Sequence, residues 1–156
     1  MIAMNEAVQR LVFHEGFRMK PYRDTKGYLT IGIGRCIDKN PFTPEEIKAV
    51  GDWKKGITRN AAYMLLRNDI RRTIAELKKK IPFWEELSDE RQYALLDMAF
   101  QMGSDGVLGF KKMLSAMALG NWVEAWRQCL DSKYGREFKT RAERIANTIA
   151  HDKFII

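Results

Sequence analysis

The chain has 156 residues, of which 46% are hydrophobic, and a formal net charge of +7. This length and apolar content predict one globular domain with a real core, and no repeat or low-complexity run indicates a fibrous or disordered protein. A basic surface attracts polyanions, which include nucleic acid, anionic lipid and acidic cell-wall polymers, and charge alone does not choose among them. No apolar run approaches the length of a membrane span or of a signal-peptide core, so we expect synthesis in the cytoplasm and no stable membrane insertion.

The cysteines and histidines are few and scattered. Cys36 and Cys129 are too few for a disulfide framework, and two free thiols are expected. His14 and His151 form no cluster with metal-ligand spacing, and the GIG at 32–34 lacks the third glycine of a dinucleotide loop. The sequence therefore predicts neither a metal nor a cofactor.

The chain begins with an amphipathic pattern over residues 2–15, in which apolar positions recur on one helical face that ends at Glu15. Gly16 is placed to stop this helix. Residues 18–35 then change to strand character and predict a β-hairpin, with Asp24 in its polar turn and Thr30 in its second strand. Gly34 suits a bend or the close approach of a ligand to the backbone.

The remaining residues predict helices. Thr43 to Glu46 form a capping box that begins a short helix, and Thr58 caps a long helix over 59–80 that Pro82 ends. Further helices are expected from Ser88 to Gly103, over 107–119, after Asn121 and over 139–150. The fold class is therefore α+β and mainly helical, with a small β-hairpin lobe at the N-terminal end and a helical lobe at the C-terminal end.

The predicted domain organisation is a single domain over 1–156. It comprises a β-containing lobe at 15–58, a connecting helix at 59–80, and a helical lobe made of 81–156 together with the N-terminal helix. A cleft between two such lobes is a common site for an extended substrate.

Two carboxylates stand in contrasting surroundings. Glu15 lies on an apolar helix face at the negative end of the helix dipole, and both features disfavour its ionised form, which suits a general acid. An ion pair with Arg18 or Arg141 would instead favour the ionised form of Glu15 and lower its pKa. The sequence leaves both alternatives open. Asp24 alone reads as a turn-forming residue, but a polar turn also keeps a carboxylate ionised. An acid and an ionised carboxylate beside a glycine-edged strand are typical of glycosidases.

The segment HEGFRMKPYRDTKGYLTIGIG at 14–34 resembles the E-G-x-(R/K)-x-x-x-Y-x-D-x-x-G-x-x-T-I-G-x-G pattern of the phage-type lysozymes, the muramidases of the T-even bacteriophages. The resemblance continues at 94–110, 121–126 and 141–145 and implies a lysozyme-like fold. It implies that Glu15 is the general acid, that Asp24 is the second carboxylate, and that Thr30 helps to position the attacking water. It also implies inversion, for which the two carboxyl groups should lie about 6.5–9.5 Å apart.

The same resemblance assigns further residues. Gly34, Phe100 and Gln101 are expected to bind substrate, and Arg141 is expected to hold and tune Glu15. Two positions depart from the family pattern. Arg35 stands where relatives may carry histidine and could pair with Asp69 across the junction of the two lobes, although a solvated pair is the alternative. Tyr134 stands where a tryptophan is expected.

The resemblance implies hydrolysis of the β-1,4 bond between N-acetylmuramic acid and N-acetylglucosamine in peptidoglycan, by a monomer, for host-cell lysis. A separate membrane-perforating protein or a delivery system would bring the enzyme from the host cytoplasm to the wall. The alternatives are a lytic transglycosylase and a non-catalytic basic module for wall or nucleic acid. No nucleic-acid partner is expected, because the basic runs Arg71-Arg72 and Lys78-Lys79-Lys80 read as a solvated helix face without interleaved aromatic residues.

Overall fold

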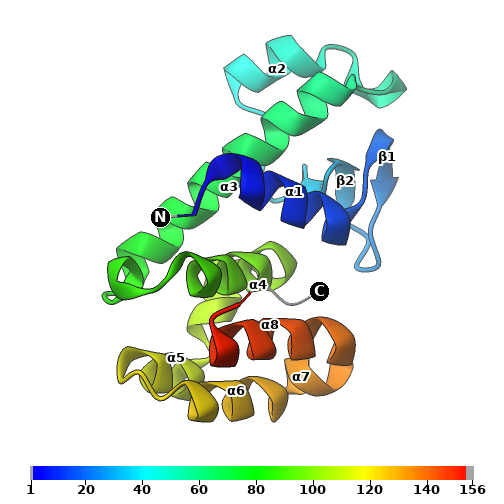
Figure 1. Cartoon of the computed structure of the whole chain (residues 1–156). Helices are drawn as coiled ribbons and strands as arrows, with labels where there is room; N and C mark the ends of the chain where they lie inside the picture. The colour runs from blue at the N-terminus through cyan, green and yellow to red at the C-terminus, as the bar shows by residue number, and fades with distance from the viewer. Residues whose placement is uncertain (1, 154–156) are drawn as a thin grey trace. The chain divides into compact units, whose positions relative to one another are not determined.

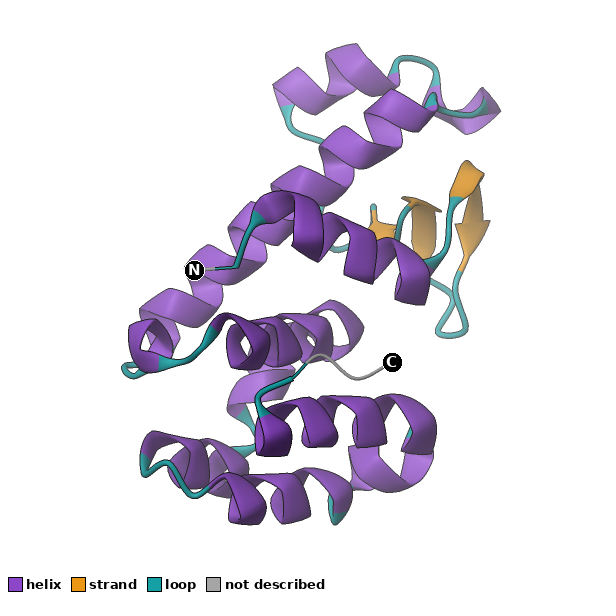
Figure 2. Cartoon of the chain, in the orientation of Figure 1, coloured by secondary structure: helices purple, strands orange, loops and turns teal. Residues whose placement is uncertain are grey.

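The computed structural model describes residues 2–153 and is mainly helical, with one small sheet (Figures 1 and 2). The strands are β1 (Arg18–Arg23), β2 (Leu29–Gly32) and β3 (Arg35–Cys36). The α-helices are α1 (Met4–Glu15), α2 (Pro44–Val50), α3 (Arg59–Lys80), α4 (Asp89–Leu108), α5 (Lys111–Ala118), α6 (Trp122–Leu130), α7 (Lys133–Glu137) and α8 (Lys139–His151). Short 3-10 helices cover Trp53–Lys55 and Trp84–Glu86. The predicted α+β, mainly helical class is confirmed.

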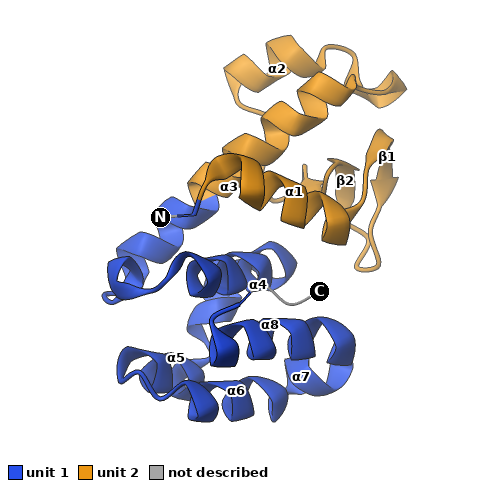
Figure 3. Ribbon diagram, viewed as in Figure 1, with its two compact units in different colours: residues 1–2, 73–156 blue, residues 3–72 orange. Residues whose placement is uncertain are grey.

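The chain forms two compact units, which Figure 3 colours separately. The N-terminal unit is Ala3–Arg72, and the described residues of the C-terminal unit are Ile2 and those from Thr73 to Lys153. The division falls inside α3, whose bounds are those that the sequence predicted. The sequence grouped the N-terminal helix with the helical lobe, whereas the contacts group α1 with the sheet. The two units are described separately below.

In the N-terminal unit, local signals determine where the helices begin and end. Gly16 has φ +74° and ends α1, and its N–H donates to the Val12 carbonyl over 3.0 Å. Thr43 and Glu46 form the predicted capping box at the start of α2. The Thr58 hydroxyl accepts from the Ala61 N–H at 3.1 Å, as expected of the residue that caps α3.

The sheet has one strand more than the predicted hairpin. Its order is β1-β2-β3, and both pairs are antiparallel. Gly32 and Gly34 have φ of +70° and +78°, which turn the chain so sharply that Arg35 pairs back onto Ile31. The strand pattern predicted β1 and β2, but it did not predict this short return strand.

The C-terminal unit is an all-helical bundle around an apolar core. Two expected helices differ from those observed. The helix expected to stop at Gly103 resumes after a break there, where φ is +80°, and continues to Leu108. The helix expected over 107–119 is interrupted at Gly109 and Phe110, so that α5 begins at Lys111. The large buried side chains of the core are Leu77, Ile81, Trp84, Leu95, Met98, Val107, Met113, Met117, Ile145 and Ile149.

Within residues 2–153, no helix is both long enough and apolar enough to span a bilayer.

Candidate active site

Glu15 is the last residue of α1 and lies directly against Gly34. A Cβ built on Gly34 would stand 3.2 Å from Glu15 Oε2 and 3.5 Å from its Cγ. The carboxylate therefore rests on bare backbone at the point where the chain turns from β2 to β3. A Cβ here would press on the carboxylate, which would have to shift by a few tenths of an ångström, and the φ of +78° is a conformation that glycine adopts at least cost. The structure thus brings together two of the predicted site residues.

Asp24 follows β1 and organises the hairpin turn. Its Oδ1 accepts from the N–H groups of Lys26 and Tyr28, each at 2.9 Å. Its own N–H donates to the Tyr28 carbonyl at 2.9 Å. These bonds fix the orientation of the carboxylate, which is only partly buried. The turn role and the proposed chemical role of Asp24 are therefore compatible.

Thr30 lies in β2, close in the hydrogen-bond network to the Asp24 turn. Its Oγ1 donates to the carbonyl of Tyr28 at 3.0 Å, and Tyr28 also donates its N–H to Asp24. Thr30 is 4% exposed, so its hydroxyl is held in one place. Tyr28 therefore connects the two residues that were predicted to orient a water molecule.

Tyr22 is a residue of this site that the sequence did not single out. It lies opposite Thr30 in the ladder of β1 and β2. Burial raises the pKa of the Tyr22 phenol, and although Arg18 lowers it, the nearby carboxylates of Glu15 and Asp24 raise it further. The signal available in the sequence was its position two residues before Asp24 in an alternating strand.

Arg35 anchors the chain immediately after Gly34. Its guanidinium is 2% exposed and binds two buried carboxylates. Nε lies 2.9 Å from Asp69 Oδ1, and Nη1 lies 2.9 Å from Glu46 Oε1. The Arg35–Asp69 pair left open by the sequence is therefore formed, and it is buried rather than solvated. The cluster ties β3 to α2 and α3 within the N-terminal unit.

The charges of this cluster depend on one another. Burial alone would raise the pKa of Glu46, but hydrogen bonds from Arg35 and Asn68 outweigh burial. The pKa of Glu46 falls from 4.5 to about 2 as a result. Arg72 adds a second cation at 3.0 Å from Asp69 Oδ1.

The other predicted site residues lie in the C-terminal unit. Gln101 Oε1 accepts from the Tyr134 hydroxyl at 2.9 Å. Tyr134 thus supplies a donor at the position where a tryptophan was expected, and its ring packs between Phe110 and Phe138. Phe100 precedes Gln101 in α4 and is partly buried.

Arg141 was expected to tune Glu15, and the structure gives it a partner in its own unit. Its Nε donates to Asp97 Oδ1 at 2.9 Å, and its Nη2 bonds the same oxygen. Asp97 is 2% exposed, so this is a buried carboxylate with a charged partner. An effect of Arg141 on Glu15 remains a prediction.

Within residues 2–153, no group of three or more His, Cys, Asp and Glu side chains could hold a metal ion. Cys36 and Cys129 are both free thiols. The N-terminal unit offers the carboxylates of Glu15 and Asp24 and the hydroxyl of Thr30. That set is suited to acid–base chemistry.

Comparison with known proteins agrees with this arrangement. The phage lysozyme family model matches residues 12–144. The chain is 38% identical to the pre-baseplate central spike protein Gp5 of Enterobacteria phage T4, over 95% of the chain but only 28% of that protein. It is 28% and 30% identical to the probable T4-type lysozymes 1 and 2 of Dictyostelium discoideum, over 89% and 86% of the chain and 90% and 88% of those proteins. The chain therefore belongs to the phage lysozyme family, and the domain that it forms is that of a lysozyme enzyme.

Proposed function

We propose that this domain hydrolyses the β-1,4 bond between N-acetylmuramic acid and N-acetylglucosamine in peptidoglycan, with inversion at the anomeric carbon. Glu15 is the general acid that protonates the leaving glycosidic oxygen. Asp24 is the general base, and Thr30 helps it to orient the attacking water. In this proposal Gly34, Phe100 and Gln101 contact the sugar chain, and Arg141 tunes Glu15.

The hydrogen bonds of Asp24 and Thr30 suit a water-orienting pair. Both backbone bonds to Asp24 use Oδ1, so we assign Oδ2 to the water. The Thr30 hydroxyl donates its hydrogen to the Tyr28 carbonyl. Oγ1 can therefore accept a hydrogen bond from the water but cannot donate one to it. A water that donates one hydrogen to each residue keeps its own lone pair for the anomeric carbon. Asp24 then accepts the proton that the water loses as the new C–O bond forms.

The contact of Glu15 with Gly34 is the main structural support for the general-acid role of Glu15. A carboxyl group that rests on bare backbone is fixed in position, and a substrate can approach it closely because no side chain intervenes. Positioning of this kind supplies much of the rate in general acid catalysis. The separation of about 6.5–9.5 Å that inversion requires between the two carboxyl groups stays a prediction.

Muropeptide analysis tests the proposal. Purified peptidoglycan is digested with the wild-type domain, and the products are identified by mass spectrometry. Hydrolysis leaves reducing muramic acid ends. Glu15→Gln and Asp24→Asn should each lower the rate by at least about a hundredfold. Glu45→Gln and Asp52→Asn are the matched controls, because both residues are exposed and belong to other parts of the N-terminal unit. Wild-type turnover by Glu15→Gln would refute the assignment.

A lytic transglycosylase is the alternative enzyme. It needs the acid but no water-orienting pair, so the arrangement of Asp24 and Thr30 favours hydrolysis. Anhydro-muramic acid ends among the products would reverse this choice.

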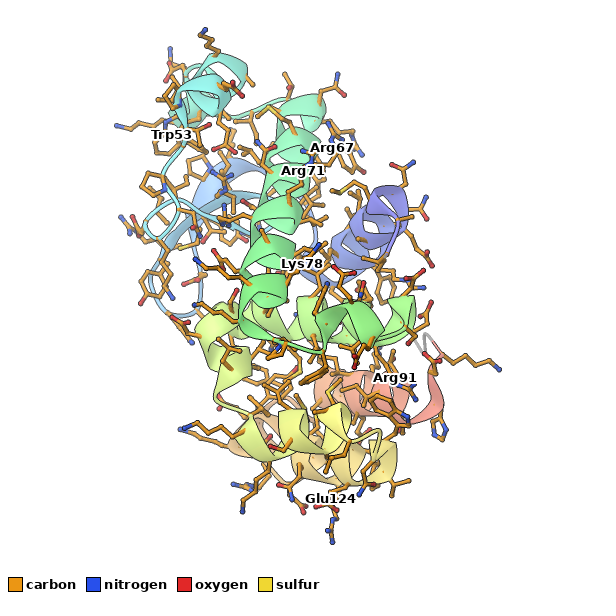
Figure 4. The ribbon with its side chains drawn as sticks, turned by 90° about the vertical axis from the view of Figure 1, so that its left-hand side faces the viewer. Trp53, Arg67, Arg71, Lys78, Arg91 and Glu124 are labelled. Atoms are coloured by element: carbon orange, nitrogen blue, oxygen red, sulfur yellow. The ribbon has the colours of Figure 1, made fainter. Side chains whose placement is uncertain are left out.

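A non-catalytic basic module is the alternative from another class. Figure 4 shows Arg67, Arg71 and Lys78 along α3. Several cations of this helix pair with acidic side chains, since Lys78 Nζ lies 2.7 Å from Glu85 Oε1 and Lys80 Nζ lies 3.0 Å from Asp105 Oδ1. Such pairing supports a solvated helix face over a nucleic-acid stripe. A salt-sensitive gel shift together with no lytic activity would support the module instead.

We propose host-cell lysis as the setting, with peptidoglycan as the partner, a monomeric enzyme, and a separate membrane-perforating protein that releases it. The similarity to one part of a phage central spike protein favours a second setting, in which such a domain acts on the wall from a baseplate. Expression inside bacteria separates the two. Lysis that depends on a co-expressed membrane-perforating protein supports the first setting, whereas association with phage particles supports the second.

A further inference from the structure

Arg35 joins three elements of the N-terminal unit at a buried point. It is the first residue of β3, and its guanidinium reaches Glu46 in the first turn of α2 and Asp69 in α3. Nη1 and Nη2 donate to the two oxygens of Glu46, while Nε donates to Asp69 Oδ1 at 2.9 Å. Nη1 also donates to the Asn40 carbonyl at 3.3 Å, in the segment between β3 and α2. One side chain therefore fixes where β3 lies against both helices.

Glu46 is itself held by several donors and is 1% exposed. Its Oε1 accepts from the Thr43 N–H at 3.0 Å, as part of the capping box, and its Oε2 accepts from Asn68 Nδ2 at 2.9 Å. A guanidinium that binds one carboxylate through two nitrogens is fixed in orientation as well as in distance. The pair of Glu46 and Arg35 is therefore a rigid link from α2 to β3.

Stability alone does not explain this buried cluster. Compared with well-packed apolar side chains, buried ion pairs add little stability, because removing the ions from water costs about as much as their attraction returns. What Arg35 adds is a defined geometry, since its planar fork meets both carboxylates in one orientation only. The cluster is therefore suited to positioning.

The segment that this link fixes is the one on which Glu15 rests. Gly34 is bonded directly to Arg35, so their Cα atoms stay about 3.8 Å apart. The pairing of Arg35 with Ile31 closes the same turn from the side of β2. Glu15 Oε2 lies 3.2 Å from the position that a Cβ on Gly34 would take. A displacement of Arg35 would therefore change how the Gly34 backbone meets the carboxylate.

We propose that Arg35 is a positioning residue of the proposed acid, and that Glu46 holds it in this role. The inference rests on the general-acid role proposed for Glu15. Arg35 acts through the Gly34 backbone and not on the reacting atoms. It keeps the Gly34 turn in place, and the turn keeps the Glu15 carboxyl group aimed at the glycosidic oxygen. A small displacement of the acid slows proton transfer and leaves the affinity for the sugar chain nearly unchanged.

Glu46→Gln weakens the link, and Glu45→Gln is the matched control. Both residues lie in the first turn of α2 and each variant loses one negative charge, but Glu45 is exposed. We expect Glu46→Gln to lower kcat about threefold to fivefold, with KM within about twofold of wild type. Glu45→Gln should keep both constants. The kinetics are measured at a temperature where circular dichroism shows each variant to be folded.

Arg35→Lys is the second variant, and Arg72→Lys is its control. Arg35→Lys keeps the charge but loses the planar fork that meets two carboxylates. Arg72→Lys makes the same change at the other cation of Asp69, whose side chain is 38% exposed. Arg35→Lys should lower kcat as Glu46→Gln does, whereas Arg72→Lys should leave it unchanged.

An NMR titration reports the position of Glu15 without any hydrolysis. In the wild type, the amide shift of Gly34 should move as Glu15 ionises, because the carboxylate lies beside this backbone. Glu15→Gln should abolish that movement. Glu46→Gln and Arg35→Lys should reduce its amplitude, because the charge then lies farther from the amide or moves between positions. Glu45→Gln and Arg72→Lys should keep the wild-type amplitude.

Three results would overturn the inference. The first is a wild-type Gly34 amide that does not respond to Glu15, a result that needs no variant to fold. The second is wild-type kcat in folded Glu46→Gln or Arg35→Lys, whatever happens to KM. The third is an equal loss of kcat in Arg72→Lys, which indicates that the cluster acts through stability alone. Failure of the proposed function is distinguishable, because the wild-type domain would then release no reducing muramic acid ends although its Gly34 amide still follows Glu15.

Discussion

The carboxylate of Glu15 lies directly beside the position that a Cβ at Gly34 would take, with Oε2 3.2 Å from it. This contact links the end of α1 to the turn between β2 and β3. It also makes the position of the proposed acid depend on a residue that has no functional group of its own.

Gly34→Ala should therefore impair catalysis more than it impairs folding. The new methyl would shift the Glu15 carboxylate by a few tenths of an ångström, and the positive φ would cost about 1 kcal/mol of folding free energy. We expect kcat/KM to fall by about threefold to tenfold, because even a small displacement of a catalytic group lowers the rate. Peptidoglycan hydrolysis and chemical denaturation measure the two effects.

Gly51→Ala is the control for backbone strain. Gly51 has φ +54°, ends α2 in the same unit, and would place its Cβ in open space. Gly51→Ala should lose about as much folding stability as Gly34→Ala while keeping wild-type activity. Equal loss of activity in both variants would show that strain, and not the contact with Glu15, causes the defect.

Local sequence rules predicted much of the N-terminal unit. The capping box at Thr43, the Thr58 cap and the bounds of α3 all follow from signals within a few residues. The turn at Asp24 is equally local, because the side chain bonds backbone groups two and four residues further on. Caps and turns are determined by residues that lie close together in the sequence, so short segments are enough to predict them.

Contacts between distant segments were not predictable in the same way. The capping pattern identified Glu46 but gave no sign of its second role as a buried partner of Arg35, eleven residues earlier. Tyr22 read as an ordinary strand residue, and only the strand register places it opposite Thr30. The apolar pattern over 107–119 predicted one helix, because periodicity does not register the break at Gly109. These features depend on tertiary packing, which a single sequence does not display.

Glu46 should make stability depend on pH in the acid range. Its folded pKa of about 2 lies below the ordinary value of 4.5. A carboxyl group of this kind contributes stability that is complete above the unfolded pKa and is lost as the pH falls toward the folded pKa. Its contribution should therefore reach about 3 kcal/mol near neutral pH and decline below about pH 4.5.

Glu46→Gln isolates this contribution. We expect the difference in unfolding free energy between wild type and Glu46→Gln to shrink as the pH falls from about 5 to 3. Urea denaturation at a series of pH values measures it. Glu45→Gln, at an exposed neighbouring position, should show almost no pH-dependent difference. A constant difference for Glu46→Gln across the range would contradict a folded pKa of about 2 for Glu46.

Tyr134→Phe should loosen Gln101 in the C-terminal unit. The hydroxyl donates to Gln101 Oε1, and this bond fixes which end of the amide can meet a substrate. Its loss should cost about 1 kcal/mol of stability. If Gln101 binds the sugar chain as proposed, KM should rise about threefold to tenfold while kcat changes little. Steady-state kinetics on a soluble muropeptide checks this, and an unchanged KM would argue against substrate contact by Gln101.

The two cysteines should react very differently with thiol reagents. Cys129 is fully buried, and burial raises the pKa of its thiol to about 12, so it should stay unmodified in the native protein. Cys36 is partly exposed and is the ladder partner of Thr30 on β3. Iodoacetamide should therefore alkylate one thiol in the folded domain, and the added bulk beside Thr30 should reduce hydrolysis. Cys36→Ser should remain active and resist the reagent, and loss of its activity on treatment would place the sensitive group elsewhere.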